Sequence, residues 1–209
     1  MLGYGAYHTL PGFFKKVIRG ETFHAALQYF SYALAGQTYM GVGRNLSYKK
    51  TLFLNNKGFA SINHLPGGDD DLFINKVATK KNTAIVIDTD AHTLSTPKKT
   101  WKDWKWQKTR HFSTSKYYKP VHKFLLGLYS FAHFLFYPLV AAAAILFDWQ
   151  YALAVLLIKS ILQFIIFSKV MKKLNETDLI SWIFVMDLWM FFYYLWFAPS
   201  LWKKERKSW

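Results

Sequence analysis

Three consecutive carboxylates, Asp69, Asp70 and Asp71, follow two glycines in a strongly basic chain. The chain has only 12 acidic residues against 27 lysines and arginines, so three acids in a row stand out. Clustered carboxylates repel one another and persist mainly where a metal, a proton transfer or a polar ligand uses them. The structural alternative is a helix N-terminus, where Gly67-Gly68 makes the turn and an acid caps backbone N–H groups.

Two further segments carry polar side chains that suit ligand contacts. Gly43, Arg44 and Asn45 come before the acidic cluster, and glycines permit close backbone approach, although a turn explains them equally well. Gln107 and Arg110 come after it, in a segment rich in tryptophan and lysine. These segments are the candidates that the fold would have to bring together.

The elements expected to position these residues form an α/β pattern. Helices are expected over residues 21–35, 72–80 and 100–113, and strands over 39–48 and 83–87. The acidic cluster starts the second helix, and Gln107 and Arg110 lie on the third. We find neither an internal repeat nor a low-complexity tract.

Composition divides the chain near residue 123. Hydrophobic residues make up 52% and aromatic residues 20%, and the apolar ones concentrate after that point. Residues 124–147, 151–168 and 179–202 are three apolar runs long enough for membrane helices, and a basic tail over 203–209 follows. We therefore expect a transmembrane helical bundle behind a mixed, basic domain over residues 1–123. No cysteine occurs, so a disulfide or thiolate site is excluded.

Flanking charge predicts how the apolar runs are oriented. Lysines precede the first run and follow the second, whereas the turn between them carries only Asp148. The positive-inside rule therefore places residues 1–123 in the cytoplasm of a multi-pass protein of the cell (inner) membrane. The basic tail conflicts with a third full crossing, so either the rule fails there or one segment is re-entrant or interfacial.

Lys159 and Asp187 are ionisable residues inside apolar runs, at similar predicted depth. We expect them to pair, because lone charges in hydrocarbon cost several kcal/mol. The alternative is that Lys159 extends to the interface and Asp187 is neutral.

The order of these motifs resembles the second half of membrane-bound family 2 glycosyltransferases, which include cellulose, chitin and hyaluronan synthases. In that family an acidic pair opens a helix at the acceptor site, and a Gln-x-x-Arg-Trp motif follows at the membrane face. Here Asp69-Asp70 and Gln107-Lys108-Thr109-Arg110 take those places, and membrane helices follow. The resemblance covers roughly residues 36–123 and implies the acceptor half of a GT-A-type domain.

The resemblance implies inverting transfer of a sugar from a nucleotide sugar to an acceptor hydroxyl by direct displacement. Asp70 would be the general base and Asp69 its support, while Asp71 would start the helix. Arg110 and Gln107 would lie near the diphosphate or the acceptor sugar. An interfacial basic helix that touches lipid headgroups is the alternative for these two residues.

His111 departs from the family pattern, which has Trp at this position as a stacking platform for the acceptor sugar. Processive synthesis on a stacked chain is therefore in question, although Trp104 and Trp106 could supply aromatic contact or simply pack at the interface. Gly43, Arg44 and Asn45 resemble the loop beside the acceptor.

The donor-binding half of the family, with its Asp-x-Asp metal motif, has no counterpart before residue 39. Asp88 and Asp90 spell such a motif, but they follow the acidic cluster, so we reject them as the donor site. We expect the chain to be the C-terminal part of a longer transferase and to be inactive alone. Mg²⁺ or Mn²⁺ would accompany the nucleotide sugar, on ligands outside this chain.

The expected partners are a nucleotide sugar, a sugar or lipid-linked acceptor, anionic membrane lipid and a polypeptide with the missing half. One alternative is a non-enzymatic basic protein that binds anionic lipid, and another is a small oligomeric transporter. Nucleic acid is not expected as a partner, because the basic residues cluster beside the membrane segments.

Overall fold

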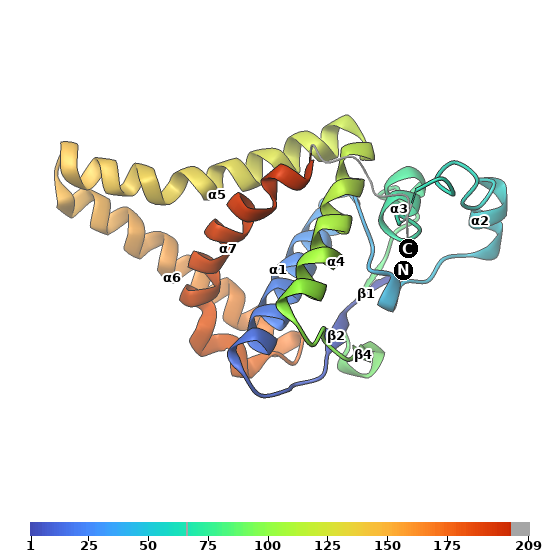
Figure 1. The fold of residues 1–209 in the computed structure, drawn as a ribbon, viewed down its shortest axis with the longest axis horizontal. Helices are drawn as coiled ribbons and strands as arrows, with labels where there is room; N and C mark the ends of the chain where they lie inside the picture. The colour runs from blue at the N-terminus through green and yellow to red at the C-terminus, as the bar shows by residue number, and fades with distance from the viewer. Residues whose placement is uncertain (66, 202–209) are drawn as a thin grey trace.

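Helices dominate the fold. The structure, a computed structural model, describes residues 1–65 and 67–201 (Figure 1). The α-helices are α1 (Phe13–Leu34), α2 (Lys50–Asn55), α3 (Asp71–Val77), α4 (Trp101–Thr114), α5 (Pro120–Leu146), α6 (Trp149–Lys173) and α7 (Ile183–Phe197). The 3-10 helices are η1 (Gly43–Asn45), η2 (Thr89–Ala91), η3 (Ser115–Tyr117), η4 (Thr177–Trp182) and η5 (Ala198–Leu201).

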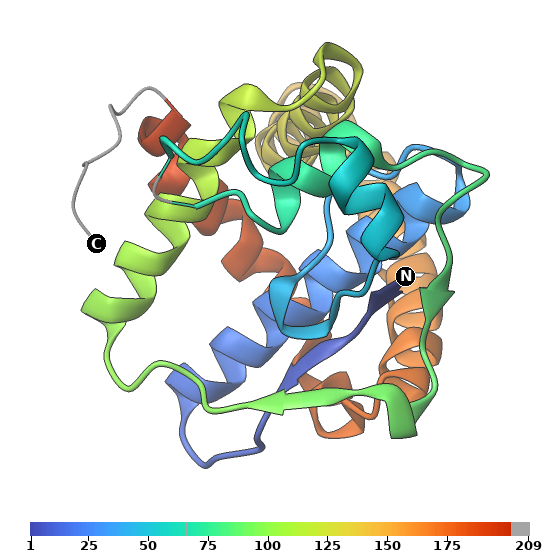
Figure 2. The ribbon, with the colours of Figure 1, turned by 90° about the vertical axis from the view of Figure 1, so that its right-hand side faces the viewer.

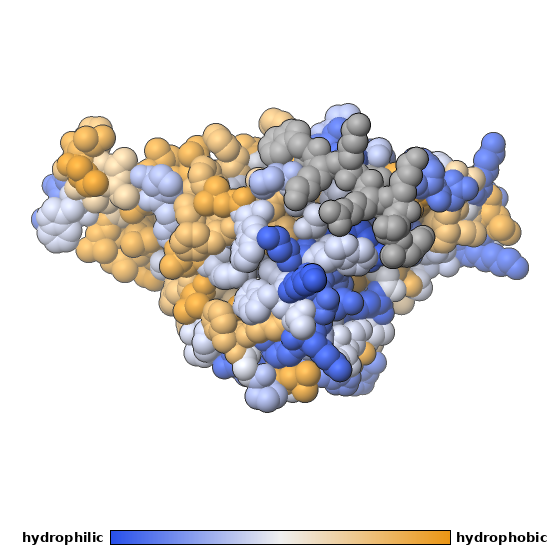
Figure 3. Space-filling model, in the orientation of Figure 1, coloured by the Kyte–Doolittle hydropathy of each residue, from blue (hydrophilic) through white to orange (hydrophobic). Residues whose placement is uncertain are grey.

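An antiparallel hairpin of α5 and α6 projects from the rest of the molecule (Figure 1). Apolar side chains cover this arm, whereas hydrophilic ones gather over the body (Figure 3). Near its turn, three large side chains are each at least 75% exposed: Ile145, Phe147 and Tyr151. Exposure of such a large apolar surface to water is unfavourable, but contact with lipid is favourable. Three helical segments, Pro120–Leu146, Trp149–Lys173 and Thr177–Leu201, are long and apolar enough to cross a membrane.

The strands of the body are short and parallel. β1 (Leu2–Gly3) pairs with β3 (Ile85–Val86), and β2 (Gly5–Tyr7) pairs with β4 (Thr93–Ser95). Figure 2 shows α1 running alongside the line of β1 and β2. The side chain of Asn45 presses so closely on Gly3 that any Cβ there would collide with it, which explains a glycine in this strand.

The strand predicted over residues 39–48 is wrong. This segment is a loop that contains η1 and makes a single antiparallel bridge, between Leu46 and Leu2. The Arg44 guanidinium donates to the Ala6 carbonyl, and the Asn45 amide donates to the Tyr4 carbonyl. Hydrogen bonds from these two side chains therefore replace the backbone hydrogen bonds that a strand beside β2 would make. The α/β expectation holds only in part, because the strands are few and two or three residues long.

The other predicted elements are present with shifted bounds. The helices expected over 72–80 and 100–113 are α3 and α4, and β3 lies within the strand expected over 83–87. The helix expected over 21–35 begins earlier, at Phe13, directly after Gly12 at φ 105°. Its extra turns bury Val17 and Ile18, which belong to the core.

One hydrophobic core joins the body to the end of the hairpin. Met171 and Leu174, near the end of α6, lie in the same cluster as Leu2 and Phe23. Arg19 of α1 forms a buried ion pair with Glu176, which follows α6, and Tyr4 donates to the same carboxylate at 2.8 Å. The core therefore includes residues from both sides of position 123.

Candidate functional site

Asp70 caps the start of α3 and faces the η1 loop. One carboxylate oxygen accepts a hydrogen bond from the Asp71 N–H and the other accepts one from the Gly43 N–H, each at 2.8 Å. A Cβ on Gly43 would lie 3.1 Å from the Asp70 carboxylate, so glycine suits this approach. Asp70 is half-buried and Asp69 beside it is exposed. The first two acids therefore face the surface at this loop.

Asp71 starts α3, as expected, but it also has a role that the sequence did not reveal. It is buried, and one of its oxygens accepts hydrogen bonds from the hydroxyls of Thr114 and Tyr118. Burial raises the pKa of the Asp71 carboxyl, and the two hydroxyl donors oppose this effect. The acid thus connects the start of α3 to the end of α4.

This connection brings Arg110 to the acidic loop. Arg110 lies one helical turn before Thr114, and its side chain passes 3.9 Å from the position of a Cβ on Gly67. Its guanidinium also lies 5.4 Å from the Trp106 ring. The guanidinium is half-exposed, so it remains available to an anion.

Gln107 and His111 lie on the same helix. The Gln107 Oε1 is buried and accepts no hydrogen bond from any residue that the structure describes, so a hydroxyl or amide donor would satisfy it. The pKa of the His111 imidazole is lowered, first because nearby protein atoms partly desolvate the ring and then because of the positive charges of Lys108, Arg110 and Arg44. His111 is therefore neutral at pH 7, and its outer edge is exposed.

Arg44 and Asn45 support the loop rather than offering free groups. Besides its bond to Ala6, the Arg44 guanidinium stacks 4.0 Å from the Tyr7 ring centre. The Asn45 amide donates to two backbone carbonyls, those of Tyr4 and Ala91. Both side chains hold Gly43 in position and are half-buried.

The structure buries Trp104, which sequence reasoning offered either as an aromatic contact for the sugar or as a packing residue. Its side chain is 1% exposed and packs against Phe14, Tyr193 and Phe197, so it forms part of the helix packing. It lies three residues before Gln107 and faces inward with α4 against α7. Trp106 is the exposed tryptophan nearest to Arg110 on this helix.

An ion pair that the sequence did not predict holds α4 against α1. Lys108 pairs with Glu21 of α1, and Glu21 also accepts a 3.3 Å hydrogen bond from Tyr193 of α7. Gln107 and Arg110, the two candidate site residues of α4, flank Lys108. The sequence places Trp101, Trp104, Lys108 and His111 on one stripe of this helix, but that pattern does not identify Glu21 as the partner of Lys108.

Within residues 1–65 and 67–201, no group of three or more His, Cys, Asp or Glu side chains is arranged to hold a metal. The three aspartates diverge, since Asp71 points into the core while Asp70 faces Gly43. The chemistry of the site is therefore that of a half-buried carboxylate, a guanidinium and an unsatisfied amide oxygen.

A second polar cluster lies among α5, α6 and α7. Lys159 forms an ion pair with Asp187, which confirms the predicted pairing. Tyr137 donates to the same carboxylate, and Gln163 donates to it at 2.8 Å. The His133 ring contacts the Asp187 backbone carbonyl at 3.2 Å. Asp187 is 7% exposed, so these partners compensate for its removal from water.

Comparisons with protein-family models, with curated proteins and with solved structures find no match to this chain.

Proposed function

We propose that this chain forms the acceptor side of an inverting, membrane-bound family 2 glycosyltransferase. Asp70 is the general base that takes the proton of the acceptor hydroxyl, and Asp69 assists at the rim. Arg110 stabilises negative charge on the leaving diphosphate or holds the acceptor, and Gln107 accepts a hydrogen bond from a sugar hydroxyl. The nucleotide sugar and its Mg²⁺ or Mn²⁺ are held mainly by groups outside this chain.

The observation that carries the proposal is the meeting of the η1 loop, the Gly67-Gly68 turn and α4 beside the acidic cluster. The η1 loop supplies the Gly43 N–H to Asp70, and the turn just before Asp70 lies against Arg110 of α4. A carboxylate that already accepts two backbone N–H groups is held in one orientation, as a general base requires.

His111 supports a restricted version of the proposal. A neutral imidazole offers one donor and one acceptor but a smaller stacking face than tryptophan. We therefore propose that the acceptor sugar is held mostly by hydrogen bonds, and that the enzyme adds single sugars or short chains.

The test uses membranes of source cells in which the gene carries Asp70→Asn. In that setting any polypeptide that supplies donor-binding groups is present. Labelled sugar is followed from a panel of nucleotide sugars into lipid-extractable and polymeric material. We expect incorporation with the unchanged gene and a loss of about 100-fold or more with Asp70→Asn, the range for a removed general base.

Asp88→Asn is the matched control, because it makes the same change of charge in an exposed acid outside the site. We expect it to leave incorporation unchanged. If Asp70→Asn and Asp69→Asn both retain full function, the enzyme proposal fails, and the chain is a non-enzymatic protein that binds lipid through the exposed lysines of α4.

A further inference from the structure

Both ends of α7 rest on the basic body of the protein. At its start, Asp178 of η4 forms an ion pair with Arg19 of α1 at 2.6 Å. At its end, Phe197 stacks on Phe112 of α4, with ring centres 5.5 Å apart. Helix α4 carries the exposed Lys102 and Lys105, α1 carries the half-buried Lys15 and Lys16 near its start, and both helices lie outside the candidate membrane spans. A helix that crossed the bilayer would carry one of its ends away from them.

The hairpin shows on which side these ends lie. Helices α5 and α6 are antiparallel and joined by the short turn at Phe147 and Asp148, so their outer ends are on one side of the membrane. Helix α4 leads through η3 into α5, and η4 follows closely after α6. Figure 1 shows α7 crossing the open end of the hairpin rather than following it to the turn.

A tryptophan and a lysine lie together at each end of α7. The Lys16 ammonium lies 4.5 Å from the Trp182 ring centre, and the Lys105 ammonium lies 4.7 Å from that of Trp196. Tryptophan prefers the membrane interface, and lysine there meets anionic headgroups. The two lysines come from α1 and α4, so both anchors belong to the same interface.

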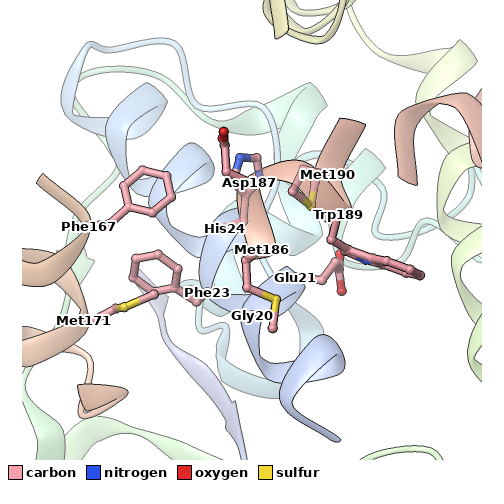
Figure 4. A pocket seen from close by; sticks show the side chains of 10 residues that line it. All are labelled: Gly20, Glu21, Phe23, His24, Phe167, Met171, Met186, Asp187, Trp189 and Met190. Atoms are coloured by element: carbon pink, nitrogen blue, oxygen red, sulfur yellow. The ribbon is translucent and has the colours of Figure 1, made fainter. Parts of the chain in front are cut away.

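The length and the faces of α7 agree with this position. Its 15 residues extend about 22 Å, less than the roughly 30 Å of a hydrocarbon core, and the segment reaches the length of a membrane span only together with η4 and η5. One face is buried against the body, and Met186 on it lies directly over Gly20 of α1 (Figure 4). The other face is apolar and about half-exposed: Phe184, Val185, Leu188, Phe192, Leu195 and Trp196.

Asp187 is the acidic residue of α7, and Lys159 of α6 neutralises it. The charge therefore does not prevent the outer face from entering the apolar layer. The basic tail that follows α7 in the sequence contains Lys203, Lys204, Arg206 and Lys207. If α7 does not cross, these lysines and arginine lie on the same side as the lysines that flank the hairpin, and the positive-inside rule is satisfied throughout.

We propose that α7 lies in the interface of the anionic leaflet that faces residues 1–119, and that the chain crosses the membrane twice. Its outer face is buried among the acyl chains just below the headgroups, in the manner of an interfacial helix. The inference is independent of the enzymatic proposal, because it rests only on the packing of α7, the two Trp-Lys anchors and the hairpin.

The absence of cysteine makes the topology directly measurable. Single cysteines are introduced as Thr51→Cys in the body, Asp148→Cys at the hairpin turn, and Thr177→Cys and Leu201→Cys at the two ends of α7; all four positions are exposed. Sealed membrane vesicles of known orientation are treated with a membrane-impermeant maleimide, before and after opening with detergent.

We expect the cysteines at 51, 177 and 201 to react from one side and the cysteine at 148 to react from the other. Reaction of position 201 from the same side as position 148 would overturn the proposal, because α7 would then cross. Pro199→Cys, also exposed, repeats the measurement at the end of α7 if Leu201→Cys fails to accumulate.

Discussion

The carboxylate of Asp71 accepts a 2.6 Å hydrogen bond from the hydroxyl of Thr114, and this contact joins α3 to α4. Asp70 is the residue before Asp71, and Arg110 lies one turn before Thr114. The buried contact between Asp71 and Thr114, which have no proposed part in the chemistry, therefore sets the spacing between Asp70 and Arg110, which do have a proposed part. Tyr118 strengthens the contact with a second hydrogen bond of 2.7 Å.

Thr114→Val should lower the free energy of unfolding by about 1–3 kcal/mol, because it removes a hydroxyl that satisfies a buried carboxylate. Chemical denaturation in detergent, followed by tryptophan fluorescence, measures the change. Ser115→Ala is the control, since the Ser115 hydroxyl bonds only locally, to the Phe112 carbonyl. Equal losses in the two variants would contradict the importance of the Asp71 contact.

Asp187→Leu should destabilise the protein by about 3–5 kcal/mol, because it leaves the Lys159 ammonium without its partner in an apolar setting. Adding Lys159→Met removes this unpaired charge, so the double variant should be more stable than Asp187→Leu alone. Thermal unfolding of the parent, the two single variants and the double variant in one detergent measures the recovery. Additive losses would show that the two residues do not stabilise each other.

The stability of the protein should fall between pH 6.5 and pH 4 because of His24. Burial lowers the pKa of His24 to about 4, against 6.5 in the unfolded chain. The unfolded state therefore binds a proton over this range that the folded state does not, and stability is lost as the pH falls. The difference corresponds to about 3 kcal/mol.

His24→Gln removes this titration, and the pH dependence of the unfolding free energy is compared between variant and parent. We expect the parent to lose more stability than the variant from pH 7 to pH 4. The variant also loses the 2.8 Å contact between the His24 ring and the Tyr129 hydroxyl. This loss lowers the stability of the variant equally at every pH in the range, so it does not change the slope. Parallel curves would contradict the lowered pKa.

Gly43→Ala should reduce sugar incorporation in source membranes, because the new Cβ would lie 3.1 Å from the Asp70 carboxylate and force it to shift. A shift of a few tenths of an ångström in a general base should cost about tenfold or more in rate. Gly127→Ala in α5, which meets no atom within 4 Å, should leave incorporation unchanged. Full activity of Gly43→Ala would argue against Asp70 as the base.

Local pattern predicted the elements whose signals lie within a single segment. The acidic start of α3, the start of α4 after Thr100 and the uninterrupted apolar runs of the hairpin each depend on neighbours in sequence. The strand expected over 39–48 failed because its outcome depends on distant partners. The side chains of Arg44 and Asn45 donate hydrogen bonds to backbone carbonyls more than 35 residues away. A local sequence pattern cannot identify such distant partners.

The sequence left the pairing of Lys159 with Asp187 as one of two alternatives, but by itself it determined an apolar hairpin next to a basic body and an acidic helix start. It did so because charge, hydrophobicity and capping act over short distances or through the bilayer. Only the tertiary structure decided that Trp104 is buried, that Asp71 turns inward to Thr114 while Asp70 faces Gly43, and that both ends of α7 rest on the body. These outcomes depend on which helix faces pack together in the core. That packing is determined by contacts between distant segments and not by the sequence within one segment.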